Sequence, residues 1–225
     1  MPIKGQDSLH LANVFRDGIA LGFLAACSLS GLIAGCSNEP IDVPCPGVAA
    51  GELVVTEVHG PQSGEDQYGE WVEIYNASDS AVDLRGLSVT FTKLDGSSQL
   101  QMFVRKSVEL AAGEYAVFGK QLSGTEPEHV NYGYLGDIGD IDGSGGKLFD
   151  SAAVEISSCG EVIDLAVYRN LPTRGSLALN GDISPPTAEA NDDEVNWCVD
   201  ELEDEDTDEK GVRGTPQEEN PSCAE

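Results

Sequence analysis

Three aspartates in a glycine-rich run are the residues whose type and spacing come nearest to a metal site. Asp137, Asp140 and Asp142 lie within residues 137–145, and the same run contains Gly139, Gly143 and Gly145. Hard cations such as Ca²⁺ bind carboxylate and backbone oxygens. Counted from Asp140, position 12 of an EF-hand loop would be Ser151 instead of a bidentate glutamate, and no helix is indicated on either side. A Ca²⁺ site therefore stays open beside the simpler interpretation that we favour, a polar loop between two strands.

Cys36 has the most specific chemistry in the chain. It ends the run Leu32-Ile33-Ala34-Gly35-Cys36, which closes a nearly apolar stretch, and an acidic sequence follows it. Small residues let a peptidase approach the backbone, and a thiol is the nucleophile that accepts a diacylglyceryl group. The pattern resembles a bacterial lipoprotein signal peptide with its lipobox. It predicts a signal peptide over residues 1–35 and a mature chain held to a membrane by acyl chains such as palmitate at Cys36.

Other interpretations of this leader explain less. A transmembrane helix needs about 20 apolar residues, and this stretch is shorter and diluted by glycine and serine. Cleavage before Cys27 would leave too short an apolar region, since about 7–15 residues are usual. The residues before the apolar stretch carry no positive excess, and a start at Val14 would be more typical of a signal peptide.

The net charge restricts the partners. The chain has 12 Lys and Arg against 40 Asp and Glu, a formal charge of -28. Nucleic-acid binding depends on basic residues that neutralise phosphates, so this charge argues against it. It also argues against electrostatic attraction to anionic lipids. Cations, basic surfaces and glycans remain as partners, and solubility through self-repulsion is the simplest role of the charge.

Four cysteines remain after the predicted processing: Cys45, Cys159, Cys198 and Cys223. An even number in an exported chain implies two disulfides, and three pairings are open. Cys45 precedes the first predicted strand and Cys223 lies near the C-terminus, so a bond between them would clamp both ends of the domain. We therefore predict the pairs Cys45–Cys223 and Cys159–Cys198.

No catalytic constellation is evident. His59 and His129 lie outside any HExxH pattern, and the chain has no G-x-S-x-G elbow or phosphate-binding loop. Cys159 as a nucleophile is less plausible than Cys159 in a disulfide, and His59 is expected at the surface. Asn76 begins a glycosylation sequon, which we interpret as a turn that ends a strand. We predict that the protein is not an enzyme and has no cofactor apart from the Ca²⁺ considered above.

Short strands must position these residues. Strand-like runs separated by turn residues occupy 52–58, 70–76, 87–92, 100–105, 115–118 and 161–168. Val154 and Ile156 precede the last run as its hairpin partner, and Ile163, Leu165 and Val167 are expected to share its buried face. Helical periodicity is missing, so the pattern predicts an antiparallel sandwich or barrel.

Two segments are expected to lie outside the strands. Residues 36–51 are rich in proline and predict a tether between the anchor and the domain. Residues 189–209 include a dense acidic run and predict a solvated loop, with Trp197 and Cys198 as its point of attachment to the core.

The motifs together resemble a known family. Residues 53–58, 69–76 and 82–87 are similar to the opening of the lamin tail domain, and 110–118, 160–168 and 214–220 follow in the family's order, although Gln217 stands where glycine is usual. The family is an Ig-like β-sandwich found in nuclear lamins and in many exported bacterial proteins. The resemblance implies an all-β, Ig-like antiparallel sandwich over residues 52–223 that serves as an accessory or interaction module without an active site.

The combined prediction is a non-catalytic, lipid-anchored protein of the cell envelope, at the outer membrane where the organism has one. Its partner is expected to be a protein or glycan at the cell surface, and no nucleic acid. Two other roles stay open. The domain would then regulate or present a partner enzyme, or act as a Ca²⁺-dependent surface adhesion protein.

Overall fold

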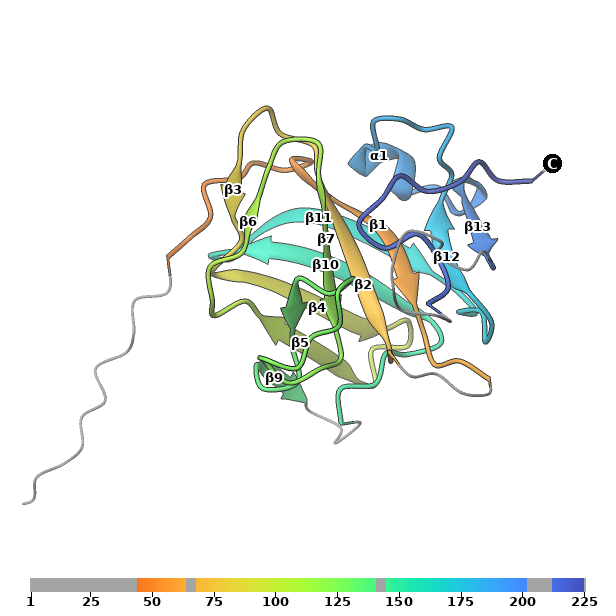
Figure 1. The fold of residues 1–225 in the computed structure, drawn as a ribbon, viewed down its shortest axis with the longest axis horizontal. Helices are drawn as coiled ribbons and strands as arrows, with labels where there is room; N and C mark the ends of the chain where they lie inside the picture. The colour runs from red at the N-terminus through yellow and green to blue at the C-terminus, as the bar shows by residue number, and fades with distance from the viewer. Residues whose placement is uncertain (1–43, 64–67, 141–144, 202–211, 225) are drawn as a thin grey trace, which may run out of the picture. The chain divides into compact units, whose positions relative to one another are not determined.

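Two β-sheets stacked face to face make up most of this computed structural model, which describes residues 44–63, 68–140, 145–201 and 212–224. In Figure 1 the strands β1, β2 and β7 lie in front of β4, β5 and β10, and the blue C-terminal part lies beside β1 and β12. The predicted all-β, Ig-like antiparallel sandwich is confirmed. No helix among the described residues is long and apolar enough to cross a membrane.

The larger sheet has six strands in the order β13-β12-β1-β2-β7-β8. Their bounds are β1 Leu53–His59, β2 Trp71–Asn76, β7 Tyr115–Gly119, β8 Tyr132–Gly133, β12 Ser176–Leu179 and β13 Trp197–Asp200. Neighbouring strands are antiparallel, apart from the parallel pair β7 and β8.

The second sheet has five antiparallel strands in the order β11-β10-β4-β5-β9. Their bounds are β4 Leu87–Lys93, β5 Gln99–Phe103, β9 Ile138–Asp140, β10 Ala152–Ser158 and β11 Glu161–Tyr168. A short pair, β3 Val82–Asp83 and β6 Glu109–Leu110, forms a separate two-stranded ribbon. The predicted hairpin of β10 and β11 is confirmed, and Cys159 in its turn has a positive φ of 50°.

Strand β2 is buried on both faces. Val72 and Ile74 point into the core between the sheets, as their alternation predicted. Trp71 and Glu73 lie on the opposite face, which alternation alone would leave in solvent, yet they are 1% and 0% exposed. The C-terminal segment, residues 212–220, covers Glu73, and its backbone bonds to side chains of β1 and β2. Trp71 packs instead against Val117, Val130 and His59.

The predicted buried face of β11 is wrong beyond Ile163. A β-bulge shifts the pairing between Ile156↔Asp164 and Ser157↔Val162, so the side-chain alternation changes phase there. Asp164 becomes buried, while Leu165 is 43% exposed. The bulge therefore places the carboxylate of Asp164 in the interior, and the side chain of Leu165, which was expected there, faces outward.

Both segments predicted to lie outside the strands are partly built into the domain. Residues 44–51 of the expected tether contact the hairpin of β10 and β11: Ser158 donates to the backbone oxygen of Pro46, and the Gly51 N–H donates to Ile163. The expected acidic loop contains α1 Ala188–Asn191, the 3₁₀ helix η1 Glu194–Asn196 and strand β13. The loop prediction fails over these residues because β12 offers a strand edge that β13 can pair with.

Candidate functional site

The most unusual group of residues lies under the C-terminal segment, on the outer face of the six-stranded sheet. Glu57 on β1 and Glu73 on β2 are register partners, and each is 0% exposed. Directly opposite residues on one face of an antiparallel pair have Cβ atoms about 5 Å apart. Two carboxyl groups therefore lie side by side in the interior.

Each carboxyl group receives one side-chain and one backbone donor. Thr56 Oγ1 donates to Glu73 at 2.7 Å, and the Gln217 N–H donates to the other Glu73 oxygen at 2.6 Å. The Ser176 hydroxyl and the Thr215 N–H both donate to Oε1 of Glu57. Oε2 of Glu57 has no hydrogen-bond partner within the described part of the chain.

The surroundings favour the neutral form of both groups. Burial, and next the charge of Glu73, raise the pKa of Glu57 well above its ordinary value, although the Ser176 hydrogen bond lowers it. Burial raises the pKa of Glu73 to about 8, although the hydrogen bonds from Thr56 and Gln217 lower it. Burial and mutual repulsion therefore disfavour two adjacent carboxylates and favour a pair that holds a proton.

An open groove lies on the solvent side of this region. It has a volume of about 610 Å³ and is lined by Gly113, Glu114, Tyr115, Asn131, Gln217, Glu218 and Glu219. Gln217 joins the groove to the buried pair, because its side-chain amide donates to Asn131 Oδ1 at 3.2 Å while its N–H reaches Glu73. Carboxylates, amides and a tyrosine ring suit a cationic or hydrogen-bonding surface group, and three glutamates repel an anion.

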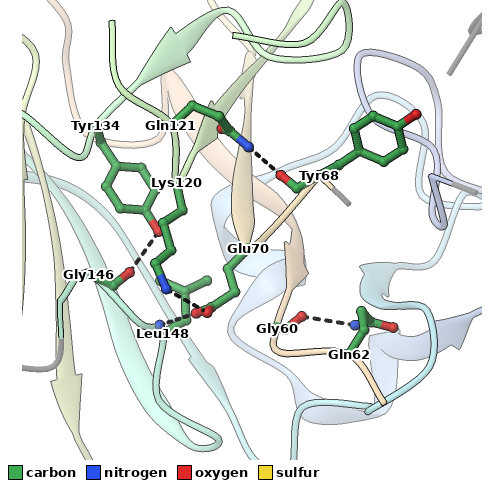
Figure 2. A network of polar contacts seen from close by, with 9 residues as sticks. All are labelled: Gly60, Gln62, Tyr68, Glu70, Lys120, Gln121, Tyr134, Gly146 and Leu148. Atoms are coloured by element: carbon green, nitrogen blue, oxygen red, sulfur yellow. Dashed lines mark hydrogen bonds and ion pairs between the residues drawn. The ribbon is translucent and has the colours of Figure 1, made fainter. Parts of the chain in front are cut away.

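A second polar network ties the loops at another part of the domain. Figure 2 shows Glu70 between the Lys120 ammonium, 3.1 Å from Oε1, and the Leu148 N–H, which donates to Oε2. The Tyr134 hydroxyl donates to the Gly146 carbonyl at 3.0 Å, and Gln121 donates to the Tyr68 carbonyl. Unlike Glu57 and Glu73, Glu70 has a cation beside it. Glu70 fixes the chain at Leu148, and Tyr134 fixes it at Gly146.

The predicted disulfide pairing is wrong, although all four cysteines are paired. The bonds are Cys45–Cys159 and Cys198–Cys223, with Cα–Cα distances of 5.7 and 5.8 Å. Cys45 meets the turn of the β10–β11 hairpin because the preceding chain packs there. Cys223 meets β13 because the chain returns across the six-stranded sheet, where the Cys223 N–H donates to Asn180 Oδ1.

The three candidate calcium ligands are not brought together by any described feature. Asp137 forms an ion pair with Arg105 at 3.0 Å and accepts the Tyr132 hydroxyl. Asp140 ends β9, and Asp142 lies outside the described residues. No cluster of three metal-ligating side chains occurs within the described ranges. The Ca²⁺ site stays a prediction, and Asp137 has structural partners of its own.

Three other candidates can be placed. Cys36 lies outside the described residues, so lipidation there stays a prediction. His59 is 4% exposed and stacks on Trp71 with ring centroids 5.1 Å apart, so the expected surface position is wrong. Asn76 is buried and its amide donates to the carbonyls of three residues, Ser80, Leu110 and Ala111. The sequon is therefore a turn, as predicted.

Sequence reasoning missed the carboxyl pair. Glu73 alternates with Val72 and Ile74, a pattern that places it on the solvent face of a two-layer sandwich. Regular alternation would place Glu57 on the core face with Val55, and a β-bulge between these two residues moves it to the outer face. Their burial comes from residues 212–220, far away in the sequence. The available signal was the closing motif Gly214-Thr215-Pro216, since Gly214 has a φ of 98° and any side chain there would collide with Glu57 and Ser176.

The fold and these contacts define an Ig-like β-sandwich. Its buried glutamates, Glu57 and Glu73, attach the C-terminal segment to the six-stranded sheet. A family profile for the Lamin Tail Domain matches residues 46–168. The chain therefore belongs to the lamin tail domain family, whose members are structural or binding modules and not typically catalytic. The match ends at the last residue of β11, so β12, β13 and the C-terminal segment extend beyond it. Searches of curated proteins and of solved structures found no match.

Proposed function

We propose that this protein is a non-catalytic binding or scaffolding module of the cell envelope, held to a membrane by acyl chains on Cys36. The family supports a binding or scaffold role in general. The lipobox-like run before Cys36 supports the anchor. Two or more acyl chains would hold the protein stably, because each buried CH₂ adds about 0.8 kcal/mol.

The observation that carries the export part of this proposal is the pairing of all four cysteines that follow Cys36. Both disulfides close within the folded domain. Disulfides persist in oxidising compartments and are rare in the cytosol. A chain that depends on two of them is suited to the outside of the cytoplasmic membrane, where lipoproteins are displayed.

Cys36→Ser tests the anchor directly. Cells expressing the natural chain or the variant are fed an alkyne-labelled palmitate, separated into membrane and soluble fractions, and probed for the protein. The anchor requires label and membrane association in the natural chain and loss of both in Cys36→Ser. Cys27→Ser is the matched control and should leave both unchanged. Membrane association of Cys36→Ser at the natural level would contradict the proposal.

The binding role needs a separate test. Crosslinking of intact cells with the anchored protein, followed by purification under denaturing conditions, captures its neighbours, and Cys36→Ser supplies the background. A Glu218→Gln/Glu219→Gln variant then tests whether the acidic groove takes part in contact. A set of crosslinked partners that is the same for the anchored protein and Cys36→Ser would count against an envelope binding function.

A further inference from the structure

Glu57 and Glu73 are both neighbours in the sheet and acceptors for the C-terminal segment. They lie opposite each other in the sheet, and they accept the backbone N–H groups of Thr215 and Gln217 from the C-terminal segment. The attachment of that segment to the sheet therefore depends on two groups whose charge changes with pH.

We propose that Glu57 and Glu73 form a proton-operated latch, in which a proton held by the pair keeps the C-terminal segment closed on the six-stranded sheet and its loss releases the segment.

The charged groups around the pair are acidic on every side. Glu57 faces Glu73 from β2 and Asp200 from β13, and Glu73 also faces Glu218 from the segment itself. Burial, and next the charge of nearby Glu73, raise the pKa of Tyr115 on β7. No lysine or arginine among the described residues forms an ion pair with either glutamate. Loss of the shared proton would leave two adjacent charges without compensation in a dry site.

The segment is the part of the surroundings that can yield. Glu57, Glu73 and Ser176 belong to paired strands, whereas residues 214–217 meet the carboxyl groups through single backbone donors. Gln217 has a φ of 70°, a left-handed conformation that favours glycine, so its backbone is strained while the segment is closed. Release would relieve that strain and admit water to both carboxyl groups.

The opening would be local. The Cys198–Cys223 disulfide fixes the end of the chain to β13, so residues 212–220 can move outward as a loop without leaving the domain. The Asn220 amide, which donates to the Thr56 carbonyl at 3.0 Å, marks the C-terminal end of the part that moves.

The raised pKa values of the two glutamates determine whether the segment opens at high or at low pH. The pKa of Glu73 is raised to about 8 in the closed state from 4.5, and Glu57 is raised as well. The closed state therefore binds more protons than an open, hydrated one, and its advantage is complete below the ordinary value of 4.5. As the pH rises from there to about 8, the ratio of open to closed molecules increases by up to about tenfold per pH unit for each proton released.

Hydrogen–deuterium exchange of the full-length chain in detergent, read by mass spectrometry, tests the latch. Peptides that cover residues 212–220 should lose protection between pH 5 and pH 8.5 after correction for intrinsic exchange. Peptides from the core strands β4 and β10 should keep theirs. The Glu73→Gln variant should hold the segment closed at both pH values, because a neutral amide keeps an acceptor for the Gln217 N–H without a charge. Glu155→Gln, a half-buried position on β10, is the matched control and should behave like the natural chain.

Trypsin gives an independent readout, because Arg213 directly precedes Gly214. Cleavage after Arg213 at pH 8.5, measured against a free peptide of the same sequence, should be at least tenfold slower in Glu73→Gln than in the natural chain. Equal protection of the natural chain at pH 5 and 8.5, equal cleavage of both chains, or simultaneous loss of protection in β4 and β10 would each overturn the latch. Closure of the segment at pH 8.5 by Ca²⁺ alone would also overturn it, since the pair would then hold a metal ion.

Discussion

The carboxylate of Asp164 on β11 accepts the backbone N–H of Val55 on β1 at 2.8 Å, so one side chain connects the two sheets. The Asn191 amide of α1 donates to the same oxygen at 2.7 Å and to the Val55 carbonyl at 3.0 Å. Burial raises the pKa of Asp164, whereas the Val55 and Asn191 hydrogen bonds lower it. The β-bulge of β11 makes this connection possible, because without it Asp164 would face away from β1.

Alanine at Asp164 should therefore be costly. Asp164→Ala leaves the Val55 N–H and the Asn191 amide without their acceptor in the interior, and we expect a loss of about 2–4 kcal/mol in the free energy of unfolding. Asn191→Ala should cost less, because Asp164 keeps the Val55 N–H. Urea unfolding measures both, and an Asn191→Ala loss larger than that of Asp164→Ala would contradict this assignment.

The bulge also decides which apolar residues of β11 matter. Ile163 is 3% exposed and Leu165 is 43% exposed. Ile163→Ala should cost about 2–4 kcal/mol, and Leu165→Ala less than about 1 kcal/mol. Comparison of the two unfolding curves checks the phase change, because regular alternation through the strand predicts equal costs for the two variants.

The backbone conformation at position 217 should favour glycine over a residue with a side chain. A left-handed conformation costs a residue with a side chain about 1–2 kcal/mol relative to glycine. Gln217→Gly and Gln217→Ala lose the same side-chain hydrogen bonds, so their difference isolates the backbone. We expect Gln217→Gly to be more stable than Gln217→Ala by about 1 kcal/mol in thermal unfolding at pH 6, where the segment is closed. Equal stability of the two would show that φ at this position carries no strain.

Stability should decline as the medium becomes alkaline. Since the raised pKa of Glu73, about 8, exceeds the ordinary 4.5, its contribution is complete below pH 4.5 and is lost as the pH rises to about 8. The slope is about 1.4 kcal/mol per pH unit for one proton while the segment stays closed, and opening of the segment reduces it. Guanidinium unfolding at several pH values should show this decline, and Glu73→Gln should flatten it. A stability that rises over this interval in the natural chain would contradict the assignment.

The two disulfides should differ in their contribution. Cys45–Cys159 spans 114 residues and Cys198–Cys223 spans 25. The chain-entropy relation gives about 4.8 kcal/mol for the long loop and about 3.5 kcal/mol for the short one. The Cys45→Ser/Cys159→Ser variant should therefore be less stable than Cys198→Ser/Cys223→Ser. The reverse order in equilibrium unfolding would mean that strain or residual structure outweighs loop length.

The sequence indicates the strands well and their partners poorly. The runs that became β1, β2, β4, β5, β7 and β11 are visible because alternating apolar residues are a local pattern. The bulge of β11 leaves no local trace, so the face of Leu165 was predicted wrongly. The disulfide pairing and the burial of Glu57 and Glu73 depend on where the chain returns after β13. Contacts over such separations follow from the assembled fold and have no periodic signal.

The Cys45–Cys159 bond has a mechanical consequence. Tension applied to the chain upstream of Cys45 passes through the sulfur atoms to the turn of β10 and β11. It does not extend the chain between Cys45 and Cys159, which holds β1, β2 and β4. Tension applied at the C-terminus likewise reaches β13 through Cys223. While both bonds are oxidised, only the chain between Cys159 and Cys198 can be stretched out by a pull on the two ends. The chain segments 45–159 and 198–223 are then protected from extension, and reduction of either bond would lengthen the extensible part.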